Sequence, residues 1–160
     1  MASTTFSGPV TSTAGFISGP DSLVAATAAT LTVTAAAHAG RTVILDRAAG
    51  QAVTLPAATG SGNAYRFFVA TTITSNTTTI KVVGDDVMAG VAIVANDTDA
   101  SASIFETAST SDTITFDGST TGGIRGATVE LQDVAADLWS VRVVGAATGS
   151  EATPFSATVS

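Results

Sequence analysis

The chain has 160 residues, of which 45% are hydrophobic and 12% charged, and its formal net charge is −7. This length fits one domain with or without terminal arms, the hydrophobic content excludes a wholly disordered chain, and the absence of cysteine excludes disulfides and thiolate metal sites. Nucleic acid and anionic membranes are not expected as partners, because they require clustered basic residues and those of this chain are scattered, at Arg41, Arg47, Arg66, Lys81, Arg125 and Arg142.

Residues 1–29 differ in composition from the rest of the chain. Two Gly-Pro pairs, Gly8-Pro9 and Gly19-Pro20, interrupt any helix or strand. Apolar residues are spaced along the same segment, at Phe6, Val10, Phe16 and Ile17. We predict an extended N-terminal arm that docks on a partner through these four side chains, with a helical turn near its end at residues 23–29. The opening residues lack a basic stretch followed by an apolar one, so no signal peptide is expected.

From residue 30 to 145 the sequence predicts a series of short strands. Apolar and β-branched residues recur in runs of four to seven, and Gly, Asn, Asp or Pro separates one run from the next. The predicted strands cover residues 30–34, 41–45, 52–55, 65–71, 77–83, 91–94, 103–106, 112–116, 128–132 and 138–144. No amphipathic helix of useful length is present. This spacing predicts an all-β body, an antiparallel β-sandwich of the jelly-roll kind.

The last two of these strands are predicted to form a hairpin whose turn is Asp133–Asp137. Residues 146–160 are rich in Ala, Ser, Thr and Gly, so they are predicted to be a flexible or docking tail, with Phe155 as its one anchor. The side chains predicted to form the core are Phe67, Val69, Ile80, Val82, Leu131, Trp139 and Val141.

Residues capable of catalysis or metal binding are scarce. His38 is the only histidine and lies in a run of small residues, so we interpret it as a loop or interface residue. Zinc is excluded because one His without Cys cannot complete its ligand set. The acidic loops Asp85-Asp86 and Asn96–Asp99 are interpreted as solvated turns, with a weak Ca²⁺ site as the alternative. No catalytic residue, metal or cofactor is predicted.

Several segments resemble small virion proteins of tailed bacteriophages, the head decoration or cement proteins. The resemblance rests on the opening MASTTFSGPV with Gly15-Phe16, on the run from Arg41 to Gly62, on Tyr65–Phe67 and on Glu130–Val134. It implies a β-sandwich or jelly-roll-like fold that is trimeric and that clamps neighbouring major capsid protein subunits. It also implies a position on the outer capsid surface and no enzyme activity.

Two other functions stay open at the level of sequence. A tail-fibre or receptor-binding module would bind sugar or Ca²⁺ through exposed loops, with Tyr65 or Trp139 as stacking residues. A hydrolase acting on the host envelope would depend on His38 or on a pair of carboxylates. The low aromatic content, 6%, argues against sugar binding and against the hydrolase alike.

Overall fold

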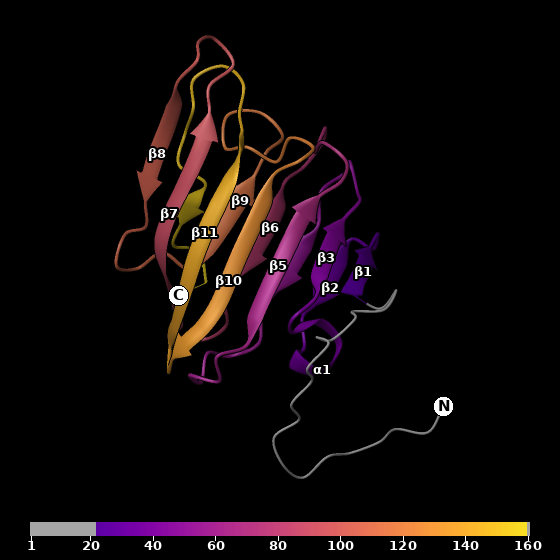
Figure 1. The fold of residues 1–160 in the computed structure, drawn as a ribbon, viewed down its shortest axis with the longest axis vertical. Coiled ribbons are helices and arrows are strands. Elements are labelled where there is room, and N and C mark those ends of the chain that lie inside the picture. The colour runs from indigo at the N-terminus through magenta and orange to yellow at the C-terminus, as the bar shows by residue number, and fades with distance from the viewer. Residues whose placement is uncertain (1–21, 160) are drawn as a thin grey trace, which may run out of the picture.

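A computed structural model of the protein describes residues 22–159, which fold into two mixed β-sheets and one short helix. Sheet A has seven strands, which lie side by side in the order β1 (Leu23–Ala26), β3 (Thr42–Leu45), β5 (Ala64–Val69), β10 (Thr128–Ala135), β11 (Leu138–Ala146), β7 (Val87–Ala95) and β8 (Ala102–Glu106). Sheet B has five, in the order β12 (Phe155–Ser156), β9 (Thr113–Phe116), β6 (Thr78–Lys81), β4 (Ala52–Thr54) and β2 (Thr30–Thr32). Sheet A is the front layer in Figure 1 and sheet B lies behind it.

The first six strands alternate between the two sheets. The odd-numbered ones join sheet A and the even-numbered ones join sheet B, so the chain completes three turns of a coil. Successive strands within one sheet therefore run parallel, as in β1–β3–β5 and β2–β4–β6. The remaining pairings are antiparallel, apart from the parallel pair β7–β11.

The core lies between the sheets and is one continuous cluster. Alternate residues of each strand point inward, as the period of two requires. In sheet A an inner row runs through Val43, Phe67, Val129 and Val143. The seven side chains predicted for the core are all buried in this cluster, none more than 4% exposed: Phe67, Val69, Ile80, Val82, Leu131, Trp139 and Val141.

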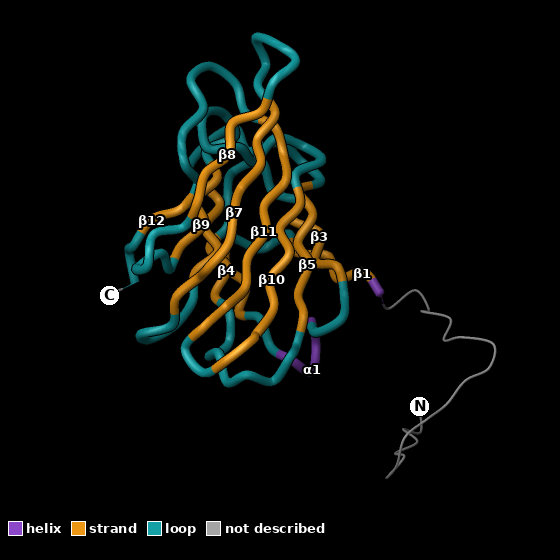
Figure 2. The backbone as a smooth tube through the Cα atoms, turned by 60° about the vertical axis from the view of Figure 1, so that its left-hand side comes forward, coloured by secondary structure: helices purple, strands orange, loops and turns teal. Residues whose placement is uncertain are grey.

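The all-β class and the ten predicted strands are confirmed, but the prediction of a purely antiparallel arrangement is wrong. The reason is the alternation of the chain between two layers, which brings strands back into each sheet in the same direction without any helix between them. The only α-helix in residues 22–159 is α1 (Ala35–His38), and no helix there is long and apolar enough to cross a bilayer. Figure 2 shows α1 at the end of the body opposite the long loops.

Three local expectations differ from the structure. Residues 23–26 form edge strand β1 rather than a helical turn, because β3 offers it a parallel partner. In the C-terminal segment Phe155 is buried and Ser156 pairs with Thr113, so these residues belong to sheet B. The turn between β10 and β11 is shorter than predicted and contains Asp137 at φ 60°, a left-handed conformation that Asp tolerates.

Candidate functional site: the outer face of sheet A

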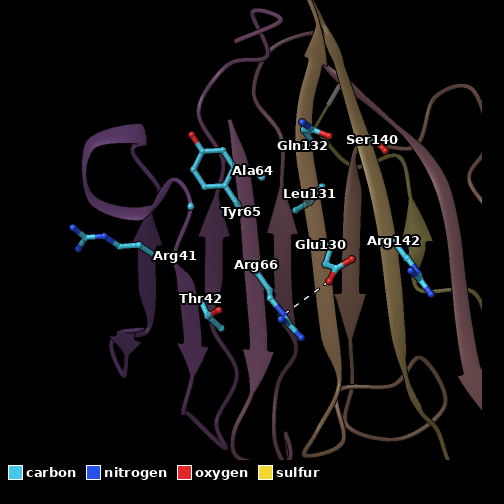
Figure 3. A pocket seen from close by; sticks show the side chains of 11 residues that line it. Arg41, Thr42, Ala64, Tyr65, Arg66, Glu130, Leu131, Gln132, Ser140 and Arg142 are labelled. Atoms are coloured by element: carbon cyan, nitrogen blue, oxygen red, sulfur yellow. Dashed lines mark ion pairs between the residues drawn. The ribbon is translucent and has the colours of Figure 1, made fainter. Parts of the chain in front are cut away.

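The outer face of sheet A carries an open depression with a volume of about 560 Å³. Three arginines line it, together with one glutamate and the hydroxyl and amide groups of Thr42, Ser140 and Gln132. Figure 3 shows these side chains on strands β3, β5, β10 and β11 and on the residues just before β3. The arginines are Arg41, Arg66 and Arg142.

This grouping corrects the expectation that the basic residues form no cluster. Half of the six basic residues of the chain line one depression. They come together because Arg66 and Arg142 occupy outward positions on strands far apart in sequence, with only β10 between them. A pattern with a period of two identifies each as outward-facing, but only the strand order makes them neighbours.

Residues of the outer face form two straight rows across the sheet. In the charged row the paired residues are, from β3 to β8, Thr42, Arg66, Glu130, Arg142, Val91 and Glu106. In the apolar row, each residue lies two positions before or after the charged-row residue of the same strand. From β3 to β8, this row consists of Ile44, Phe68, Thr128, Val144, Ile93 and Ile104. The charged row thus alternates in sign on three neighbouring strands.

Glu130 lies between two arginines of the charged row. The Nε of Arg66 is 4.0 Å from its Oε1, and both side chains are 54% exposed. Figure 3 shows this pair as a dashed line and Arg142 on the next strand. An ion pair so exposed to water adds little stability by itself. These groups are therefore available for contact with a partner.

The apolar row is unusual because it faces outward. Ile104 is 66% exposed and Val144 is 39% exposed, and the other members of the row are half-buried. In Figure 1 no described segment crosses the front of sheet A. Contiguous apolar side chains on an otherwise polar surface are typical of interaction sites.

His38 is the last residue of α1 and is buried there, so it does not lie in a loop. Its Nδ1 accepts a hydrogen bond from the backbone N–H of Thr34 at 3.0 Å, which satisfies one of the free donors at the start of the helix. Thr34 also caps the helix through its hydroxyl, which accepts from the N–H of Ala37 at 3.4 Å. This geometry gives His38 a structural role at the start of α1.

Tyr65 and Trp139 are both buried, so neither can stack on a sugar. Their rings meet edge to face, 5.6 Å apart between centroids. Burial and the nearby Asp133 carboxylate raise the pKa of Tyr65. The indole Nε1 of Trp139 donates to Asp86 at 3.3 Å. This removes the stacking residues that the receptor-binding alternative required.

The acidic loops do not assemble a metal site in residues 22–159, where no group of three or more His, Asp or Glu is placed to hold an ion. Asp86, expected to be solvated, is buried and accepts a hydrogen bond from the N–H of Ala58 at 2.7 Å. Asp99 accepts from the N–H of Ser101 at 3.0 Å, which is the turn chemistry expected of it.

Asp133 holds a loop in place, a role not predicted from the sequence. Its carboxylate accepts from the N–H groups of Thr59, Gly60 and Ser61 and from the hydroxyls of Thr59 and Ser61. The only sequence signal is an Asp at an inward position of β10, where an apolar residue would normally stand.

The predicted arm residues Phe6, Val10, Phe16 and Ile17 lie outside the described residues. Comparison with protein-family models, with curated proteins and with solved structures found no match to this chain. The functional conclusion therefore depends on the geometry of the body and on the resemblance carried by the sequence.

Proposed function

We propose that the protein is a virion structural protein that decorates and stabilises a bacteriophage capsid by binding across subunits of the major capsid protein. The resemblance of the sequence to head decoration proteins supports this proposal. On this proposal the protein lies on the outer capsid surface and has no enzyme activity.

The observation that carries the proposal is the position of β1. This strand is at the edge of sheet A and has β3 as its one partner in the sheet. The preceding segment, which contains the four apolar anchors, therefore joins the body at a sheet edge. Each anchor that is buried on a capsid contributes about 1.5–3 kcal/mol, and several copies on one shell add avidity.

The test is binding of the full chain to purified capsids that lack it, compared with a variant without residues 2–20. We expect the full chain to saturate defined sites and to raise the temperature at which the heads release DNA, and the deletion to lose both effects. A second variant changes Phe6, Val10, Phe16 and Ile17 to Ser, and its matched control changes Thr5, Thr11 and Ser18 to Ala. Equal occupancy of all variants would contradict docking through the arm.

The alternative is a tail-fibre or receptor-binding attachment module. Labelling of intact virions with an antibody against the full chain separates the two functions. Label over the whole head supports decoration, whereas label restricted to the tail supports the alternative and contradicts our proposal.

A further inference from the structure

The outer face of sheet A is uncovered, although the sequences of its strands are typical of strands that are buried on both faces. Strands β3, β5 and β7 contain the runs TVIL, FFV and VAIV, in which inward and outward positions are both apolar. Runs of this kind are typical of strands that are covered on both faces. Sheet B covers the inner face, and no described segment covers the outer one.

We propose that the cover is the same face of a second copy of this chain. The two copies would be related by a two-fold axis that lies parallel to the strands, between β10 and β11. Such an axis keeps each residue at the same height along its strand and reverses the strand order. It therefore places β10 over β11 of the other copy, β5 over β7 and β3 over β8.

The charged row is complementary to itself under this symmetry. Glu130 of each copy faces Arg142 of the other, so two ion pairs form at the centre of the contact. Thr42 faces Glu106 of the other copy. Arg66 retains its ion pair with Glu130 of the same copy, and the aliphatic part of its side chain lies over Val91 of the other copy. A uniformly acidic partner would fit less well, because Glu130 and Glu106 would repel it.

The apolar row matches as well. Phe68 faces Ile93 of the other copy, and Ile44 faces Ile104, the most exposed large apolar side chain in the described part of the chain. The same axis thus pairs opposite charges in one row and large apolar groups in the other. An arbitrary pairing of two faces would not be expected to satisfy both rows.

The contact area between the two copies is sufficient for a specific dimer of modest affinity. Six strands spaced about 4.8 Å apart span about 29 Å, and six residues at about 3.3 Å each span about 20 Å. The contact then covers on the order of 600 Å² per copy, at the lower end of specific interfaces. We therefore expect dissociation in the micromolar range.

The test is sedimentation equilibrium of the full chain between about 1 and 100 μM. We expect the mass of two chains at the upper end and one at the lower. Arg142→Glu and Glu130→Arg each place like charges opposite one another and should weaken dimerisation at least tenfold. The double variant reverses both ion pairs and should restore the dimer. Lys81→Glu, on the outer side of sheet B, makes the same charge change as Arg142→Glu and should have no effect.

Ile104→Glu tests the apolar row independently and should also give a monomer. Far-UV circular dichroism checks that every variant is folded. A wild-type monomer at 100 μM, a dimer insensitive to these changes, a trimer, or a double variant that stays monomeric would each overturn the proposal. A trimer would favour the oligomer that the resemblance implies, and because the test uses no capsid, none of these outcomes decides the decoration function.

Discussion

Buried carboxylates hold the loops of this protein against its two sheets. Asp86 binds the N–H of Ala58 and the indole of Trp139, and Asp112 accepts from the N–H groups of Thr158 and Val159 at 2.8 and 3.0 Å. Asp133 fixes the segment of residues 59–61. A buried carboxylate that accepts several N–H bonds can offset its desolvation. These aspartates therefore stabilise the loops that they contact.

Asp133→Asn should lower the free energy of unfolding by about 2–4 kcal/mol at pH 7. The new amide nitrogen would replace one carboxylate oxygen and would face donors of either Ser61 or Gly60. The charge that strengthens the bonds would also be lost. Urea unfolding followed by Trp139 fluorescence measures the change. Asp85→Asn, in an exposed loop, is the matched control and should be near neutral.

The same residue predicts a dependence on pH. Desolvation acts to raise the pKa of Asp133, but the hydrogen bonds from Ser61, Thr59 and Gly60 outweigh it, so the pKa lies well below its ordinary value of 3.8. Because the folded pKa is lowered, this stabilisation is complete above the unfolded pKa and is lost as pH falls toward the folded one. The difference in midpoint between wild type and Asp133→Asn should be constant from pH 7 to 5 and should shrink below about pH 4. A difference that grows on acidification would contradict this account.

At the scale of elements, close approach of backbones fixes the parallel pair β7–β11. Gly90 on β7 pairs with Val141 on β11. A Cβ placed on Gly90 would lie 1.8 Å from the carbonyl oxygen of Val141. The sequence predicted a strand over residues 91–94 only, and the observed strand, Val87–Ala95, is longer and includes Gly90. Only the pairing with β11 explains why the position requires Gly.

Gly90→Ala should destabilise the protein by about 1–3 kcal/mol, because β7 must move away from β11 to admit the methyl group. Thermal unfolding measured by circular dichroism tests this. Ala89→Ser changes the adjacent exposed residue on the same strand and should shift the midpoint little. Equal midpoints for Gly90→Ala and wild type would show that the strands adjust without cost.

At the scale of the whole molecule, the two sheets share one core, and the chain passes repeatedly from one sheet to the other. Because the chain crosses between them after each of the first five strands, neither sheet can separate while the other stays intact. Phe155, on β12 of sheet B, packs into the same cluster as Trp139 of sheet A. The two sheets should therefore unfold in a single transition.

Phe155→Ala tests this coupling. Loss of the ring should cost about 3 kcal/mol and should lower the unfolding midpoint reported by Trp139, although the two residues lie in different sheets. Ala157→Ser, exposed in the same terminal segment, is the control. A midpoint of Trp139 that does not move would mean that β12 frays independently of the body.

The sequence by itself determined the all-β class, ten strands, the seven predicted core residues and the absence of disulfides, because period-two patterning and composition act locally. The tertiary structure alone decided the parallel pairings, the place of β1 and β12 in the sheets, and the burial of the Asp86 and Asp133 side chains. It also decided the candidate site. Arg66 and Arg142 are 76 positions apart in the sequence, and they become neighbours only because β10 lies between their strands. Strand order depends on long-range pairing across the whole core, and no local pattern in one sequence specifies it.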